Sequence, residues 1–478
     1  MMQSVRRVFA LPSKMRWFEW LWLGLPVAVW FSYQPVLRLG QNETMYFELS
    51  VAVVYLAIVA AMSVPLLWQQ RRALVARKAV WLSGAFVLWS LITLLWTPNA
   101  LRGALTCLIV GGLLALFWGM LARGDALRRM APSIARVFIG MTVVMSGVAI
   151  VQFFAGIWLD QTTTLLCAGC QAVQFGFVRP NGFTIEPQFF GGLLVLGVLL
   201  LAQGLLKSPA RWYVWAALLC VMTVLVLTLS RGAVLSLLIA GVIITTIYWR
   251  QWRTVIKIVG TGVVSIALAL VLQGWAAAHH PVIEETFGGA IQKSVHQLTM
   301  GTVRLEIPAE MPPEQSTKPS EANVPSSDTD TALDKTTPVF DGYVEESTNI
   351  RLALSELALS TWSRDMPTRL FGVGTGGAGI AMHQMYPERI GSREIVQNEY
   401  IETLLEGGIV KLGLSIALLV SLAVITRKQP WYWAVLAACM VQWLFFSGYP
   451  NALHAYLALI VMAALHLSSS VQTPFAKS

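Results

Sequence analysis

The sequence predicts an all-α polytopic membrane protein with one large polar loop. Hydrophobic residues make up 56% of the 478-residue chain. Charged residues make up 12%, whereas a soluble globular domain carries roughly 25%. The third observation is the recurrence of apolar stretches that are long enough to cross a bilayer as helices.

The chain contains about twelve such stretches, each of about 17 to 24 residues. They lie at residues 17–36, 47–68, 79–96, 102–121, 135–158, 187–206, 212–230, 232–249, 256–274, 408–425, 431–448 and 453–468. The 19 tryptophans fit belts at the two membrane interfaces.

The links between these stretches alternate in charge, and this alternation predicts their sides of the membrane. Basic residues gather in one set of links, for example at 71–78, 123–136 and 250–257, while the other set is nearly free of them. Basic links face the cytoplasm, so we expect both termini there. The net charge of +9 is spread over these short links, which argues against a nucleic-acid partner and for the lipid bilayer as the surroundings.

Two outward links are unusually polar, at about 160–187 and 274–407, and the second divides the chain into three parts. Residues 1–274 form the first nine predicted spans, residues 275–407 form the large outward loop, and residues 408–478 form the last three spans. Within the loop, 308–337 is rich in Pro, Ser, Thr, Glu and Asp and is predicted to be disordered. Helical periodicity returns at 350–362.

A glycine-rich run, Gly372-Val-Gly-Thr-Gly-Gly-Ala-Gly379, follows that helix. No Lys-Ser/Thr pair follows it and no strand precedes it, so a nucleotide P-loop is not expected. A tight turn with an exposed backbone is the better interpretation.

Four arginines map to the outward side, where the charge pattern of the links should exclude them. They are Arg179, Arg231, Arg351 and Arg364. Arginine beside apolar helices is costly unless an anion or a carboxylate satisfies it, and the guanidinium fork suits phosphate. The alternatives are a loop-capping pair of Arg179 with Glu186, snorkelling of Arg231, and a solvated helix face for Arg351.

Candidate acids and bases lie on the same side. Glu186 precedes the span at 187–206, and Glu399 or Glu402 precedes the span at 408–425. Either could take a proton from a sugar hydroxyl. Asn398 could instead cap the helix that follows it. His383 is more often structural than catalytic in such a setting. Cys167 and Cys170 could form a local disulfide, and no metal or cofactor is expected.

The order of these elements resembles the O-antigen ligase and O-antigen polymerase superfamily of bacterial envelope glycosyltransferases. The matching pieces are Arg179-Pro-Asn-Gly-Phe-Thr, Leu229-Ser-Arg231-Gly-Ala, Arg351 on a helix ending near Trp362, Gly372-x-Gly374, and Asn398-Glu-Tyr-x-Glu-x-Leu-x-Glu-Gly-Gly. The resemblance spans residues 135–425.

The resemblance implies a GT-C-like fold in the bacterial inner membrane, with a metal-independent active site facing the periplasm. Members move a glycan from undecaprenyl pyrophosphate to a hydroxyl of lipid A-core or of another glycan chain. Family arginines hold the pyrophosphate, a role carried here to Arg179, Arg231 and Arg351.

This chain departs from the family at one position. Ligases usually carry a histidine directly before the asparagine, where this sequence has Gln397. An amide cannot act as a base, so Glu186, His383 or Glu399 would replace it, or leaving-group stabilisation would dominate. The departure favours a polymerase or an atypical transferase.

A transporter or flippase of lipid-linked glycans is the alternative function. Such a protein would place ionisable residues near the bilayer midplane and use interrupted helices. The predicted spans carry almost no ionisable residues, which favours an enzyme.

Overall fold

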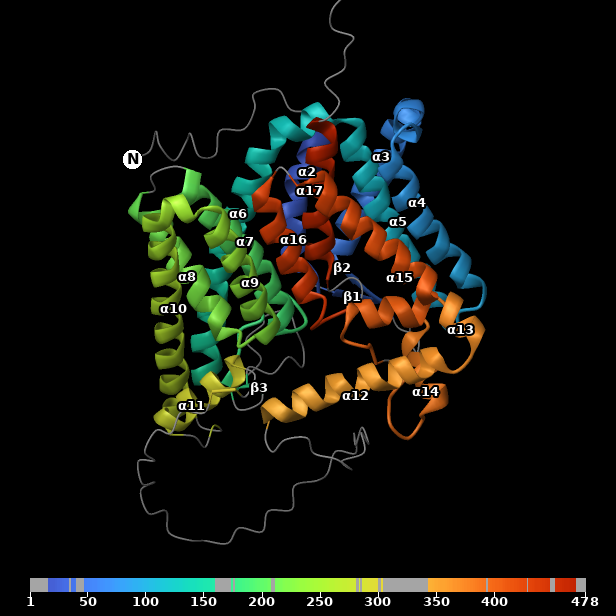
Figure 1. Ribbon diagram of the computed structural model, residues 1–478. Helices are drawn as coiled ribbons and strands as arrows, with labels where there is room; N and C mark the ends of the chain where they lie inside the picture. Colours follow the sequence, from blue (N-terminus) through green and yellow to red (C-terminus); the bar gives the residue numbers. More distant parts are fainter. Residues whose placement is uncertain are drawn as a thin grey trace, which may run out of the picture.

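The computed structural model describes the chain as a bundle of long helices with shorter helices across one end (Figure 1). It describes all residues except 1–15, 34–35, 40–46, 160–172, 175–176, 208–210, 281–282, 284–285, 300–301, 304–342, 393, 428, 448–451 and 470–478. The predicted disordered segment 308–337, Cys167 and Cys170 lie outside the described residues.

The first half of the bundle comprises nine α-helices and two short antiparallel ladders within the described residues. In order these are α2 (Trp17–Ala28), β1 (Val36–Leu39), β2 (Phe47–Ser50), α3 (Val51–Val75), α4 (Lys78–Ile92), α5 (Ala100–Ala122), α6 (Gly124–Leu159), β3 (Val173–Gln174), β4 (Phe177–Val178), α7 (Pro187–Lys207), α8 (Trp212–Leu227), α9 (Arg231–Ile247) and α10 (Trp252–His279). Three short 3-10 turns adjoin these helices. The turn η1 (Val29–Phe31) extends α2, η2 (Thr93–Leu95) extends α4, and η3 (Trp249–Gln251) precedes α10. Strand β1 pairs with β2 and β3 with β4, in the registers Val36↔Ser50 and Val173↔Val178.

The second half continues the bundle after an outward excursion. It comprises α11 (Phe287–Leu298), α12 (Tyr343–Ser363), α13 (Met366–Phe371), α14 (Ala378–Met385), α15 (Glu399–Ile425), α16 (Pro430–Gln442) and α17 (Leu453–Ser469). We call the end of the bundle that carries α11 to α14 the loop face.

Every predicted span coincides with a helix of the structure. Seven helices of the described residues are long and apolar enough to cross a membrane, and shorter apolar helices occupy Trp17–Phe31, Trp212–Leu227, Arg231–Ile247 and Leu453–Ser468. The chain is therefore a mainly helical, multi-pass membrane protein, and the count of twelve crossings stays a prediction. The two small ladders are additions that the all-α prediction did not include.

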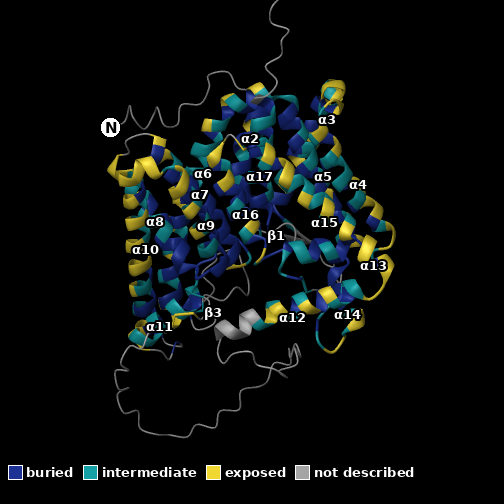
Figure 2. Ribbon diagram, in the orientation of Figure 1, coloured by how far each residue is buried: buried dark blue, intermediate teal, exposed yellow. Residues whose placement is uncertain are grey.

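Helix α7 is the centre of the bundle. It is apolar on all sides and most of its residues are buried (Figure 2), as expected of a helix surrounded by other helices. Gly191 and Gly192 let α7 approach its neighbours, because a Cβ atom there would lie 2.9 Å from Ala233 Cβ and 2.5 Å from His454 Nε2. This packing fixes the start of α7, and with it Glu186 and Gln188, at the loop face.

The predicted helix at 350–362 is confirmed as part of α12, which lies across the loop face (Figure 1). Its buried side chains Leu354, Leu357 and Ala358 share a small apolar core with Met382 of α14 and with Val396. This second core holds the loop-face helices to one another.

The glycine-rich run docks between α5 and α15. The Val373 and Gly374 N–H groups donate to the Leu405 and Glu406 carbonyls, each over 2.9 Å, and the Gly376 N–H donates to Glu406 Oε1 over 2.8 Å. Gly374 has a φ of +101°, and a Cβ atom there would lie 2.4 Å from Thr97 Cα. The run is a tight turn, as predicted, but the prediction of an exposed backbone is wrong, because residues 372–379 are buried and N–H groups of the run donate within the protein.

Helix α15 breaks at Gly408, which has a φ of +67° and a ψ of −170°. The break coincides with the predicted start of the span at residue 408. The preceding part of α15, Glu399 to Gly407, carries the polar residues that the sequence places before that span. Gly408 also lets Leu370 of α13 pack closely, since a Cβ atom would lie 2.1 Å from the Leu370 carbonyl oxygen.

We predict that Gly408→Ala destabilises the protein by about 1–3 kcal/mol, because it forces a left-handed backbone and a collision. Gly413→Ala is the matched control on the same helix, where a Cβ atom meets nothing within 4 Å. It should be neutral or slightly stabilising. Melting temperatures of the two purified variants in detergent measure the difference, and equal values would contradict the role of the break.

Candidate functional site

Arg351 joins three separate segments of the chain at the loop face. Its Nε donates to Gln397 Oε1 over 3.1 Å, and its terminal amine donates to Gln188 Oε1 over 2.7 Å. Gln188 belongs to the first turn of α7, and Gln397 lies just before α15. The solvated-face alternative for Arg351 is therefore wrong, because the side chain is partly buried and doubly bonded.

Gln188 extends this chain of contacts to Glu186. Its amide nitrogen donates to Glu186 Oε2 over 2.5 Å, while its oxygen accepts from Arg351. A glutamine with both ends engaged cannot rotate freely, so it fixes the guanidinium and the carboxylate relative to each other. The structure thus brings Glu186, Arg351 and Gln397 together, although they are far apart in the sequence.

Arg179 lies beside the same turn, where the loop after β4 meets the end of α8. Its Nε donates to the Thr228 carbonyl over 2.9 Å. The loop itself is held by Gln152 of α6, whose amide bonds the Gly182 carbonyl over 2.8 Å and accepts from the Gly182 N–H over 2.9 Å. The positive charges of both Arg179 and Arg351 act on the Glu186 carboxyl, and we call Arg179, Arg231, Arg351 and Glu186 the arginine cluster.

Arg231 is the first residue of α9, directly after the turn that Arg179 contacts. Its side chain is only 7% exposed, so the snorkelling alternative is wrong. A cation at a helix N-terminus opposes the helix dipole, and a buried cation is costly without negative partners. The helix that Arg231 begins is capped by Ser230, whose Oγ accepts a hydrogen bond from the Ala233 N–H over 3.3 Å.

Two residues of this site adopt a backbone conformation that L-residues avoid. Among the described residues, Leu229 and Gln397 are the only non-glycine residues with positive φ, at 48° and 56°. Leu229 lies two positions before Arg231, and Gln397 itself contacts Arg351. Such strain persists where the surrounding structure imposes it, and it concentrates at functional sites.

Asn398 follows Gln397 and caps α15. Its Oδ1 accepts from the Tyr400 and Ile401 N–H groups over 3.1 and 3.2 Å. The capping alternative for Asn398 is confirmed. The cap fixes the direction in which Gln397 leaves the helix, and Asn398 therefore supports the site through the backbone.

Glu186 has an environment suited to proton transfer. Its side chain reaches solvent, yet desolvation by the surrounding protein raises the pKa of its carboxyl above the ordinary value. The positive charges of Arg351 and Arg179 oppose that rise, and the negative charge of Glu394 adds to it. Burial also raises the pKa of Glu394. A carboxyl with a raised pKa is a better base when ionised.

Two other predicted residues, His383 and Glu399, have hydrogen-bond partners elsewhere in the structure. His383 Nδ1 lies 2.7 Å from the Ile390 carbonyl, so the ring holds the loop after α14. Glu399 accepts from the Tyr456 hydroxyl of α17 and turns toward the bundle.

Glu399 lines an apolar groove of about 200 Å³ between α4, α5, α15 and α17. Leu113, Leu418 and Ile460 are among its walls, and Glu399, Trp443 and Tyr456 form its polar part. The Glu399 N–H donates to the Trp443 carbonyl over 2.9 Å. Glu399 is two residues after Gln397, so this end of the groove lies near the turn that carries Gln397.

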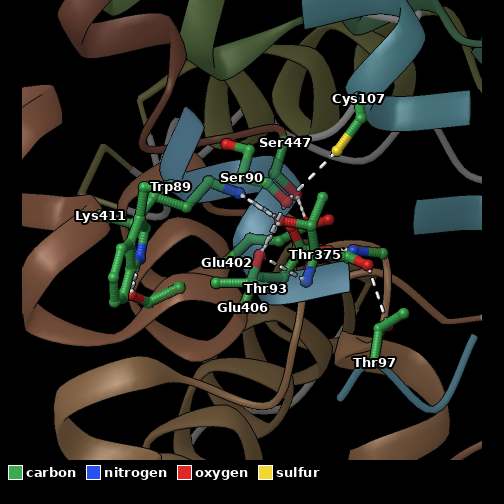
Figure 3. A network of polar contacts seen from close by, with 12 residues as sticks. Trp89, Ser90, Thr93, Thr97, Cys107, Thr375, Glu402, Glu406, Lys411 and Ser447 are labelled. Carbon is green, nitrogen blue, oxygen red and sulfur yellow. Dashed lines mark hydrogen bonds and ion pairs between the residues drawn. The ribbon is translucent and has the colours of Figure 1, made fainter. Parts of the chain in front are cut away.

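Beside the groove, a buried polar network anchors the first turns of α15 (Figure 3). Lys411 Nζ lies 3.3 Å from Glu406 Oε2, Arg102 lies 3.8 Å from Glu402, and Ser447 donates to Glu402. Of these residues only Lys411 lies within the predicted span at 408–425, and the glutamates precede it, as the sequence predicted. Mutual pairing offsets the cost of their burial.

Arg102 is a residue that the sequence analysis missed. It lies in the first turn of α5 at the loop face, and its side chain is half-buried against Glu402. Its position directly after an outward link, near Thr97–Ala100, was the signal that could have found it.

Comparison with protein families adds independent information to this geometry. Residues 215–414 match the family model described as O-antigen ligase. This match supports the resemblance to the O-antigen ligase and polymerase superfamily over that segment. No curated protein matches the chain. The matched segment contains Arg231, Arg351 and Gln397, while Arg179 and Glu186 lie before it. The family match supports a glycan-transfer activity of the ligase or polymerase type.

We predict that neighbouring charges move the acidic limb of the pH–rate profile in opposite directions. Arg351→Gln removes a cation, raises the pKa of Glu186 and shifts the limb to higher pH. Glu394→Gln removes an anion, lowers the pKa of Glu186 and shifts the limb to lower pH. Both signs follow because a base must be deprotonated to act.

The control is Arg369→Gln, which removes an exposed guanidinium bonded only to the Ser363 carbonyl. Initial rates of glycan transfer between pH 4 and pH 9 provide the measurement. Shifts of the same sign in the two site variants would exclude Glu186 as the titrating group.

Proposed function

We propose that this protein transfers a glycan from undecaprenyl pyrophosphate to a saccharide hydroxyl at the periplasmic face of the bacterial inner membrane. The acceptor is a growing glycan chain or lipid A-core. The observation that carries the proposal is the meeting of Arg351 and Arg179 around Glu186 at the loop face, beside the buried Arg231.

The arginines would bind the pyrophosphate that leaves the donor. Guanidinium forks suit phosphate oxygens, and fixed positive charge stabilises the negative charge that develops as the bond to the sugar breaks. Three guanidinium groups can supply this charge, so we propose that the transfer needs no metal. The contacts of Arg351 with Gln188 and Gln397 hold its fork in place before substrate binds.

Glu186 is our candidate for the base that replaces the family histidine. In the proposed step the acceptor oxygen attacks the anomeric carbon, and the bond from that carbon to the pyrophosphate oxygen breaks. The hydroxyl proton passes to Glu186, and undecaprenyl pyrophosphate leaves. The raised pKa of Glu186 and its link through Gln188 to Arg351 support this assignment over Gln397, which is an amide.

The apolar groove between α4, α5, α15 and α17 is suited to the lipid chain of the donor. Its walls are almost entirely apolar, and its polar part at Glu399 and Tyr456 adjoins the turn that carries Gln397. A chain lying there would place its head group toward Arg351.

The orientation in the membrane follows from the charge of the links. The basic links 71–78 and 123–136 lie at the end opposite the loop face (Figure 1). We propose that this end is cytoplasmic, with both termini, and that the arginine cluster is periplasmic.

We predict that Arg351→Ala lowers the rate of transfer about 10²- to 10³-fold, as removal of one stabilising donor does elsewhere. Arg351→Lys should restore little, because an ammonium cannot bond both amides in a fork. Arg369→Ala is the control and should retain activity. Transfer from the lipid-linked donor in proteoliposomes is the measurement, and full activity of Arg351→Ala would refute the proposal.

We predict that Leu418→Trp, which narrows the groove, raises the KM for the undecaprenyl donor about tenfold. A donor analogue with a short lipid should be affected less. Val420→Trp is the matched control, because Val420 is 55% exposed on the same helix and does not line the groove. Equal KM values for the two variants would place the lipid chain elsewhere.

A further inference from the structure

A second cavity lies at the loop face, away from the arginine cluster. It has a volume of about 490 Å³ and lies between α13, α14 and the link from α4 to α5. We call it the aromatic cleft and define it by Trp96, Pro98, Arg364, Phe371 and Gln384. Ligand sites are commonly about 300–1,000 Å³ in size.

One side of the aromatic cleft presents two rings that keep much of their surface exposed. Trp96 is 40% exposed and Phe371 is 42% exposed. Both rings are held from behind by Trp89, whose centroid lies 6.5 Å from Trp96 and 5.9 Å from Phe371. The Trp96 indole N–H is fixed by the Gly372 carbonyl at 3.1 Å. The rings are therefore positioned before any ligand arrives.

The cleft also has a polar lining. It includes Arg364, the one of the four predicted outward arginines that the proposed reaction does not use. Arg364 Nε donates to Asp365 Oδ2 over 2.9 Å and to Thr368 Oγ1 over 3.1 Å. These contacts fix the guanidinium through its Nε. Hydrogen bonds from Thr368 lower the pKa of Asp365, with a smaller contribution from Arg364. The exposed side chain of Gln384 adds an amide.

This combination matches a saccharide better than a lipid chain. A sugar ring has an apolar face for an aromatic ring and hydroxyl groups at its edge for charged and amide side chains. A hydrocarbon chain in the same space would separate Arg364, Asp365 and Gln384 from water without bonding them. The mixed lining therefore favours a polar ligand with apolar faces.

The position of the cleft indicates which part of a glycan it would meet. Helix α12 runs across the loop face from the region of β3 to α13 and α14 (Figure 1). Arg351 and Arg364 are 13 positions apart, or roughly 20 Å along a helix at 1.5 Å per residue. A glycan whose reacting end lies at Arg351 would reach the cleft only with a sugar several units away.

We propose that the aromatic cleft binds saccharide rings of the donor or acceptor glycan several units from the reacting bond. This inference rests on the proposed function, since it assigns a remote subsite for the same substrate. Its consequence is a dependence on glycan length. Oligosaccharides that span the distance from Arg351 gain affinity from the cleft, and shorter ones do not.

The test uses two matched pairs of variants. Gln384→Trp fills the cleft, and Met385→Trp places the same side chain at an exposed neighbour on α14 that does not line it. Phe371→Ala removes an aromatic face, and Leu370→Ala is its exposed neighbour. All four positions are at the surface, so the full-length protein should fold with each substitution.

The measurement is transfer in proteoliposomes with substrates of one to six repeat units from the polymer that the host makes. Gln384→Trp and Phe371→Ala should raise the KM for the longer substrates about tenfold and leave kcat and the single-unit KM unchanged. Unchanged KM values at every length, or equal effects in the matched controls, would overturn the inference.

A direct binding measurement separates this inference from the proposed function. Delipidated oligosaccharides of the same polymer are titrated into the wild-type protein in nanodiscs and followed by saturation-transfer NMR. Saturable binding that Gln384→Trp abolishes and Met385→Trp retains would support the cleft even if the wild type transferred nothing. The inference would be overturned if the wild type showed no such binding. It would also be overturned if the wild-type cleft held a phospholipid of the nanodisc that Gln384→Trp releases.

Discussion

The site depends on the way Arg351 is held. Two glutamine amides from different parts of the chain accept hydrogen bonds from one guanidinium. Gln188 comes from the buried central helix α7, whose packing cannot shift easily. Gln397 comes from a strained turn. The planar guanidinium fork thereby couples the helix bundle to the loop-face helices, and it does so at the place where a substrate phosphate would bind.

The strained turn at Gln397 is maintained by contacts further along α15. Asn398 caps the helix, Glu406 accepts from the glycine-rich run, and Lys411 pairs with Glu406. These buried polar groups satisfy one another, so the first part of α15 can lie among apolar helices despite its charges. The break at Gly408 then redirects the chain into the bundle. Structure far from Arg351 thus determines where Gln397 presents its oxygen.

The described residues form three different environments. The groove beside Glu399 is apolar, the cluster around Glu186 is charged, and the aromatic cleft is mixed. A lipid-linked glycan has three parts of the same character, namely a hydrocarbon chain, a pyrophosphate and a row of sugars. The correspondence between site and substrate supports the proposed function more strongly than any single residue does.

The sequence alone determined the membrane class, the helix positions and the outward arginines, because hydropathy and charge act locally along the chain. It also predicted the helix at 350–362 and the turn at Gly372–Gly379. Only the tertiary structure decided that Arg351 contacts Gln188, that His383 contacts the Ile390 carbonyl, and that Arg102 pairs with Glu402. Those facts depend on side chains from distant segments, and helix packing, not local propensity, determines which of them meet.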